Sequence, residues 1–79
     1  MRLRDTTPEM VETFAFLKEY FKDWGHAPTQ EEIAEEFSIS RQAAAKRLFS
    51  LEKRQVIYVK DGQHRGITML KQSFPENGY

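Results

Sequence analysis

The chain has 79 residues, no cysteine and zero formal net charge. This length holds one small domain with little room for an enclosed active site, and the missing cysteines exclude disulfides and thiolate metal sites. No apolar run approaches the roughly 18 residues of a membrane span, and the first residues lack the apolar core of a signal peptide, so we expect a cytoplasmic protein.

The first predicted element is a helix from about Thr7 to Trp24. A capping box from Thr6 to Glu9, with Pro8 in the first turn, marks its start, and Gly25 marks its end. Apolar side chains recur along this helix at heptad-like spacing: Met10, Phe14, Leu17, Phe21 and Trp24. Because this spacing is typical of a buried face, we interpret the stripe as core packing rather than as a cofactor or partner surface.

Residues 28–48 have the pattern of a helix-turn-helix, two short capped helices around a three-residue turn. Thr29 and Glu32 predict a capping box for the first of these helices, and Ser40 caps the second, which is basic. The first helix has the apolar stripe Ile33, Ala34 and Phe37. The second has Ala44, Leu48 and Leu51, with Gln55 on the same side. Both stripes predict faces that pack against the rest of the domain.

Two short β-branched and aromatic runs follow, Val56–Val59 and Ile67–Leu70, with an Asp-Gly turn signal between them. They predict a β-hairpin. The expected fold class is therefore α+β, a three-helix winged helix-turn-helix over residues 1–70 with a C-terminal two-stranded hairpin as its wing. Residues 71–79 have no period and predict a flexible tail. His26 and His64 lie too far apart to suggest a ligand pair, so we expect no metal and no cofactor.

The zero net charge hides an uneven distribution along the chain. Residues 1–40 carry nine acidic groups against four basic ones, whereas residues 41–65 carry seven basic groups against two acidic ones. A duplex responds to charge within about a Debye length, roughly 10 Å, so a basic face can bind it despite an acidic back. Segment 41–65 therefore predicts a nucleoid-associated protein that binds double-stranded DNA. A solvated face with ordinary i, i+4 ion pairs is the alternative.

The directions of the side chains on the basic helix follow from helical geometry, because each residue turns by about 100° relative to the one before it. We measure these directions from Ala44. Four side chains point away from the core side: Gln42, Lys46, Phe49 and Lys53. We interpret this outward face as the DNA-reading face. Ala43 and Ala45 are small enough to let the helix enter the major groove, although high helix propensity explains them equally well. The aromatic Phe49 should be covered by the wing or by a partner.

The start of the basic helix carries side chains that suit base edges and phosphates. Gln42 offers the bidentate amide that matches adenine, and Arg41 and Lys46 suit guanine edges or phosphates. Ser40 can present its hydroxyl or its backbone N–H to a phosphate. These four side chains are therefore candidates for contacts with base edges and phosphates.

An ordered series of short runs extends from residue 7 to residue 67. The runs are Thr7–Met10, Gly25–Thr29, Glu32–Ala34, Ile39–Ala43, Leu51–Lys53, Val56–Ile57 and Arg65–Ile67. Together they resemble the N-terminal DNA-binding domain of LexA, the SOS repressor, over roughly residues 7–70. The resemblance implies a bacterial repressor that binds operator DNA as a homodimer on an inverted repeat. It also implies base contacts from the second helix of the helix-turn-helix and wing contacts to the DNA backbone.

The resemblance and the residue chemistry together define one set of expected DNA contacts. Its members are Thr29, Ser40, Arg41, Gln42, Ala43, Ala45, Lys46, Lys60, Gln63, His64 and Arg65.

This sequence departs from the LexA pattern at several points. Ser38 and Gln55 occupy positions where the family usually has glycine and where positive φ is common, so each would cost about 1 kcal/mol if that conformation is kept. Ala45 and Lys46 stand where acidic residues are usual, so the operator sequence is expected to differ. No counterpart of LexA's second domain, with its dimerisation surface and Ser/Lys self-cleavage site, follows Leu70. We therefore expect a fragment of a larger repressor or a stand-alone regulator of phage or mobile-element origin.

A different function class stays open beside DNA binding. The domain could be a winged-helix protein-interaction module that binds a protein partner through Phe49 or the acidic face of its first two helices. An RNA-binding module is weaker, because only Tyr58 is a candidate for base stacking on the sheet. Nothing predicts an enzyme: the paired carboxylates Glu31–Glu32 and Glu35–Glu36 are expected on the solvent side of a helix.

Overall fold

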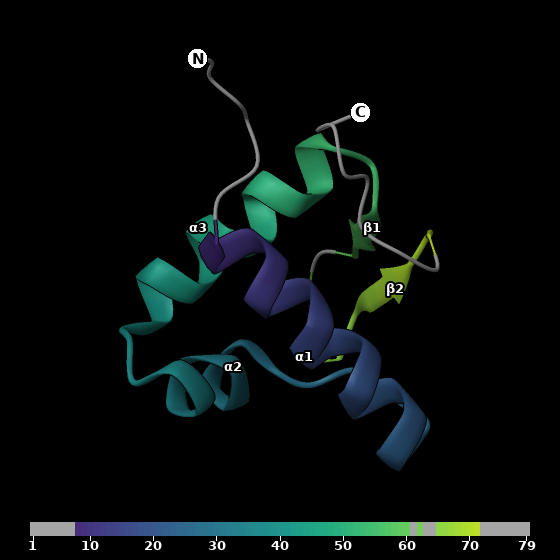
Figure 1. Ribbon diagram of the computed structural model, residues 1–79, viewed down its shortest axis with the longest axis horizontal. Helices are drawn as coiled ribbons and strands as arrows, with labels where there is room; N and C mark the ends of the chain where they lie inside the picture. The colour runs from purple at the N-terminus through teal and green to yellow at the C-terminus, as the bar shows by residue number, and fades with distance from the viewer. Residues whose placement is uncertain (1–7, 61, 63–64, 72–79) are drawn as a thin grey trace.

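Three helices and a two-stranded hairpin follow one another along the chain, with the hairpin beside the first helix (Figure 1). The structure is a computed structural model that describes residues 8–60, 62 and 65–71. Its elements are α1 (Pro8–Trp24), α2 (Gln30–Phe37), α3 (Arg41–Lys53), β1 (Ile57–Val59) and β2 (Ile67–Met69). The predicted α+β winged helix-turn-helix is therefore confirmed. The predicted cap at Thr6 and the predicted tail beyond Lys71 lie outside the described residues.

The two helices of the helix-turn-helix begin where their caps predict. The Thr29 hydroxyl accepts a hydrogen bond from the Glu32 N–H at 3.1 Å, and the Glu32 carboxylate accepts one from the Thr29 N–H at 2.9 Å. This pair is the predicted capping box. At the start of α3 the Ser40 hydroxyl accepts from the Ala43 N–H at 3.0 Å. Side chains within three residues of each helix start thus fix where α2 and α3 begin.

Left-handed residues end both of these helices. Ser38 has φ 55° after α2, and its N–H donates to the Glu35 carbonyl, while Gln55 has φ 61° after α3. Both residues therefore keep the positive φ that is common at these family positions, at a cost of about 1 kcal/mol each relative to glycine. The prediction that Gln55 lies on the inward face was wrong, because α3 ends at Lys53 and the left-handed turn leaves Gln55 exposed.

The core lies where the three helices and the hairpin meet. Its fully or nearly fully buried side chains are Met10, Phe14, Leu17, Ala27, Ile33, Ala34, Ala44, Leu48, Leu51, Val56, Ile57 and Ile67. Both helix-turn-helix stripes are thereby placed as predicted, with Phe37 packed against the core in part. The interpretation of Trp24 as a core residue was wrong. It is 65% exposed because it ends α1 beyond the packed region, and its ring contacts Tyr20 instead.

The hairpin forms a short antiparallel pair with Tyr58 opposite Thr68. Each strand is one residue shorter than predicted. The Leu70 N–H still donates to the Val56 carbonyl at one end, and the Lys60 N–H donates to the Gly66 carbonyl at the other, both at 2.9 Å. In the described parts of the chain, none of the helices combines the length and apolar character needed to cross a membrane.

Candidate nucleic-acid interface

The first half of α3 and the start of α2 border a shallow, open depression. It is lined by Gln30, Ser40, Arg41, Gln42 and Ala45. Ser40, Arg41 and Gln42 are exposed, and Ala45 is partly exposed. The two helix N-termini are held here by their own caps, so a ligand in the depression would meet amide, guanidinium and backbone N–H donors.

A single exposed stripe continues along α3 from this depression. Gln42, Lys46, Phe49 and Lys53 recur on it at i, i+4, i+7 and i+11, and all four are exposed. The core residue Ala44 lies on the opposite side, fully buried. Phe49 is 62% exposed, and the Lys53 ammonium lies 5.6 Å from the centre of its ring, in cation–π range. Within the described residues the wing does not cover Phe49.

One cation of the basic segment faces inward instead. The guanidinium carbon of Arg47 lies 4.9 Å from the ring centre of Phe37, and its Nη1 atom donates to the Thr13 hydroxyl at 3.2 Å. Thr13 is fully buried in α1. Arg47 therefore fastens α3 to the other two helices, and segment 41–65 presents less free positive charge than its sequence suggests.

Arg65, a predicted DNA contact, is also engaged inside the molecule. Its Nη1 and Nη2 atoms donate to the two carboxylate oxygens of Glu32, at 2.9 and 3.1 Å. Nη1 also donates to the Ala27 carbonyl at 2.8 Å and to the Tyr20 hydroxyl at 3.3 Å, and it lies 3.5 Å from His26 Nδ1. Glu32 is thus part of a bridge, which corrects the interpretation of its carboxylate as an ordinary solvated charge. Sequence reasoning missed this bridge.

The bridge changes the acidity of Glu32. Hydrogen bonds from Arg65, then from the Thr29 N–H and the Tyr20 hydroxyl, lower the pKa of the Glu32 carboxyl to about 2. The same pairing raises the pKa of the Arg65 guanidinium above its already high usual value. Both groups therefore stay charged throughout the physiological range, with side chains about one-third exposed.

The lowered pKa predicts an acid-sensitive contribution to stability. Because the pKa of Glu32 is lower in the folded protein than in the unfolded chain, its ion pair stabilises the fold above pH about 4.5 and is lost as the pH falls toward about 2. We expect Glu32→Gln to lower the urea midpoint of unfolding at neutral pH but hardly at pH about 2. Measuring the difference between variant and wild type at each pH cancels the other carboxylates. A difference that stays constant with pH would contradict the pairing.

The remaining predicted contacts fall into three groups. Thr29 uses its hydroxyl as a helix cap, and Ala43 is partly exposed on α3. Lys60 is exposed at the end of β1 on the wing. Gln63 and His64 lie outside the described residues. The structure thus brings the α3 residues together on one surface and sets Lys60 apart from them on the hairpin.

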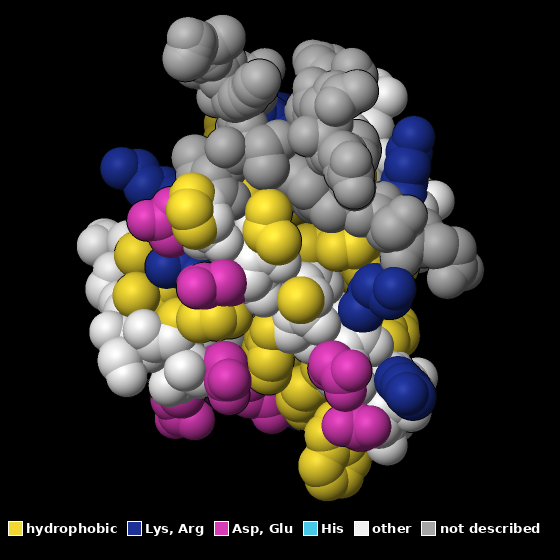
Figure 2. All heavy atoms as spheres, in the orientation of Figure 1, with side chains coloured by type: hydrophobic (Ala, Val, Ile, Leu, Met, Phe, Trp, Pro, Cys, Tyr) yellow, Lys and Arg dark blue, Asp and Glu magenta, His cyan; other side chains and the backbone are white. Residues whose placement is uncertain are grey.

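The acidic residues lie mainly on the first two helices. Figure 2 shows several acidic side chains over α1 and α2 on the face that it presents. α2 carries four glutamates and no basic residue. The charge asymmetry along the sequence is therefore also an asymmetry between elements, because α3 and the residues that follow it hold eight of the twelve lysines and arginines.

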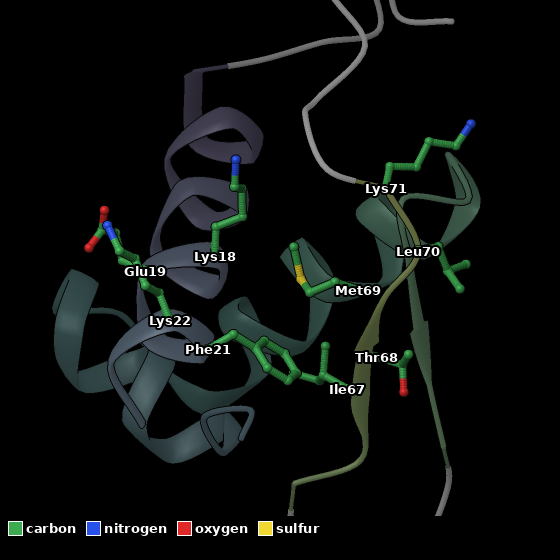
Figure 3. Close-up of a pocket in the computed structure, with 9 residues that line it drawn as sticks. All are labelled: Lys18, Glu19, Phe21, Lys22, Ile67, Thr68, Met69, Leu70 and Lys71. Atoms are coloured by element: carbon green, nitrogen blue, oxygen red, sulfur yellow. The ribbon is translucent and has the colours of Figure 1, made fainter. Parts of the chain in front are cut away.

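A groove between α1 and β2 is another concave surface. Figure 3 shows Phe21 from α1 pointing toward Ile67 and Met69 from β2, with Lys18 at the rim. Ile67 is buried, and Phe21 and Met69 are partly buried against the core. The groove thus marks where the hairpin packs on α1, and its lining comes from α1, β2 and the two residues after β2 rather than from α3.

Comparison with known proteins decides the family. The sequence matches the LexA DNA-binding domain over residues 4–66, which include all three helices and the first strand. The chain belongs to the LexA DNA-binding domain family.

LexA repressors of several bacteria match over most of this chain. The repressor of Leptospira interrogans is 31% identical over 90% of the chain, and that of Vibrio cholerae 36% identical over 86%. The repressor of Pseudomonas chlororaphis is 39% identical over 77%. The chain spans about a third of the length of these curated relatives, 35%, 33% and 31% respectively. The likeness to LexA therefore concerns the DNA-binding domain, and the α3 surface is the candidate interface within it.

Proposed function

We propose that this LexA-family domain binds double-stranded DNA in a sequence-specific way and represses transcription, with α3 in the major groove and the wing on the DNA backbone. The observation that carries the proposal is the exposed stripe along α3, which is polar at its start and rises from a helix-turn-helix whose boundaries are fixed by caps. The family match to a DNA-binding domain supports it independently. In this role the domain is a regulator and not an enzyme.

Each side chain at the start of α3 has a distinct role in the proposed complex. Gln42 reads adenine with its amide, and Arg41 and Lys46 contact guanine edges or phosphates. Ser40, whose hydroxyl caps the helix, offers backbone N–H groups near the same end to a phosphate. Ala43 and Ala45 allow close approach to the base edges.

On the wing, Lys60 contacts a phosphate, because it is an exposed cation at the end of the hairpin that is paired through the Gly66 carbonyl. Gln63 and His64 stay in the proposed contact set on their sequence positions alone. Thr29 contributes by capping α2 beside the depression, and Arg65 differs from the other predicted contacts because it is paired with Glu32.

The curated relatives are repressors, which supports a homodimer on an inverted repeat as the form that binds an operator. A regulator of this kind acts at the chromosome, so we propose a cytoplasmic, nucleoid-associated location. Lys46 is basic where the family usually has an acidic residue. This difference supports the proposal that the domain recognises a different operator sequence.

Two variants should separate sequence reading from general affinity. Gln42→Ala should relax the preference at one base pair, because a bidentate amide–adenine contact is worth about 1 to 3 kcal/mol of discrimination. Lys60→Ala should weaken binding to all sequences alike and reduce the salt slope by about one. Selection of duplexes from a randomised pool by the wild type and both variants gives base preferences at every position.

The two variants serve as controls for each other, since each removes one exposed polar side chain from a different element. If Gln42→Ala leaves every base preference unchanged while Lys60→Ala alters them, α3 is not the reading helix. Failure of the wild type to enrich any duplex sequence would remove the proposed function itself.

A further inference from the structure

The hairpin of this domain has few contacts of its own. Only three residue pairs connect β1 and β2, and an isolated two-stranded hairpin is marginally stable at best. Val56 and Ile57 anchor its base in the core, and Ile67, opposite Val59, is buried at the outer end of the strands. Beyond the strands, none of the described residues at the Lys60 end is buried. The orientation of that outermost part therefore depends on polar contacts in addition to the packing of Ile67 and Val59.

Arg65 provides such contacts, to three separate parts of the helical body. Its guanidinium reaches the carboxylate of Glu32 in the first turn of α2, the hydroxyl of Tyr20 in α1 and the carbonyl of Ala27 in the loop between these helices. The residue lies two positions before β2 and next to Gly66, which accepts the bond from Lys60. One side chain thus ties the outer end of the hairpin to both α1 and α2.

The receiving side of this bridge is held in place independently of Arg65. Glu32 Oε1 accepts the capping bond from the Thr29 N–H at 2.9 Å and a bond from the Tyr20 hydroxyl at 3.0 Å. The carboxylate is therefore oriented by α1 and by the start of α2. An arginine fork matches such a fixed carboxylate in two-point geometry, which a lysine ammonium cannot reproduce.

This engagement also argues against a direct phosphate contact by Arg65. The guanidinium already donates to Glu32, Ala27 and Tyr20, and its positive charge is balanced by the Glu32 carboxylate. A phosphate contact would have to use the remaining N–H groups of the guanidinium, and the phosphate would compete with the Glu32 carboxylate for the same positive charge. The geometry therefore favours an indirect role.

We infer that Arg65 is a positioning residue for DNA binding: its bridge to Glu32 fixes the wing relative to the α2–α3 unit, so that Lys60 is held ready for its phosphate. This inference rests on the proposed function, because it assigns a role within the same interface. With the bridge cut, the hairpin end samples other orientations, and binding must first select the productive one. If that orientation is occupied about one-tenth of the time, affinity falls about tenfold.

The test uses Glu32→Gln, Arg65→Ala and Arg65→Lys, with Glu31→Gln as the matched control. Glutamine at position 32 still serves a capping box, so α2 keeps its start while the ion pair is lost. Glu31 is an exposed acidic residue in the same first turn, so Glu31→Gln makes the same charge change beside the bridge. Affinity is measured for a duplex that the wild type selects from a random pool, and thermal unfolding verifies that each variant is folded at the assay temperature.

We expect Glu32→Gln and Arg65→Ala each to weaken binding about tenfold, and their combination to weaken it no further. Arg65→Lys should resemble Arg65→Ala, and Glu31→Gln should bind at least as tightly as the wild type. In the Arg65→Ala background, Lys60→Ala should reduce affinity by a smaller factor than it does in the wild type, because part of the wing contact is already lost. A purely stabilising residue would leave the effect of Lys60→Ala intact.

A direct phosphate contact predicts the opposite sign at Glu32. Arg65→Ala would then reduce the salt slope by about one, whereas Glu32→Gln would tighten binding by releasing a cation. Tighter or unchanged binding by Glu32→Gln overturns the positioning role and leaves the proposed function intact. If the wild type binds no duplex at any salt concentration, the proposed function fails, and the positioning role fails with it.

Discussion

The affinity of this chain for duplex DNA should fall steeply as salt is raised, with a log–log slope near −4. Four exposed cations lie on the proposed interface: Arg41, Lys46, Lys53 and Lys60. Each phosphate that they neutralise contributes about 0.9 to the slope through counterion release. Between about 50 and about 200 mM salt, binding should therefore weaken roughly 150- to 250-fold. Arg47 and Arg65 are not counted, because both donate to partners inside the protein.

Fluorescence anisotropy at several salt concentrations measures this slope directly. Lys46→Ala should make it shallower by about one, whereas Lys22→Ala, which removes an exposed lysine from α1, should leave it unchanged. Equal effects of the two variants would mean that the charge of the whole molecule, and not the α3 face, attracts DNA. A flat salt dependence would favour the protein-interaction module instead.

The boundaries of the helix-turn-helix could be predicted from the sequence because their causes are local. The hydroxyls of Thr29 and Ser40 accept hydrogen bonds from N–H groups three residues away. The short sequence pattern that predicts each cap therefore also contains the residue that the cap bonds. Apolar spacing within α2 and α3 likewise identified which side of each helix packs inward. The positive φ values of Ser38 and Gln55 followed from the family pattern and not from their own chemistry.

The predictions for Trp24 and Gln55 were wrong because a periodic pattern in the sequence continued beyond the part of the helix that is packed against the core. The apolar stripe of α1 continues in sequence to Trp24, but the packed body of the domain ends earlier, so the last member of the stripe is exposed. Gln55 shares a helical direction with Ala44 only if α3 continues, and α3 ends at Lys53. Periodicity predicts the side of a helix, whereas the extent of the core depends on what packs against it.

The internal roles of two arginines could not be predicted from spacing. Arg65 and Glu32 are 33 residues apart, and Arg47 and Thr13 are 34 apart, so no local pattern joins them. Charge counting assigned both arginines to the basic surface. Only the fold shows that both arginines form hydrogen bonds within the protein. The number of cations that are free to contact DNA is therefore smaller than the sequence suggests. The predicted DNA contacts on α3 stay predictions, supported by their common exposed face.

Replacing Leu51 by alanine should lower the free energy of unfolding by about 2 to 5 kcal/mol, the usual cost of truncating a fully buried leucine. Leu51 is 0% exposed in the part of the core where α3 meets the start of the hairpin, and its carbonyl accepts the N–H bonds of Arg54 and Val56. A domain of this size has a total stability of only about 4 to 12 kcal/mol. The substitution should therefore remove a large share of the stability, and the variant should lose its fold and its DNA binding at a lower temperature than the wild type.

Leu70→Ala is the matched control, because it removes the same atoms from a side chain that is 53% exposed. The Leu70 N–H, which donates to the Val56 carbonyl, is unchanged by the substitution, so the hairpin keeps that bond. We expect a loss of no more than about 0.5 kcal/mol, typical of a surface substitution. Urea unfolding followed by far-ultraviolet circular dichroism gives both values. Equal losses at positions 51 and 70 would mean that Leu51 does not lie in the core, and the base of the wing would then lack the packing that holds it to α3.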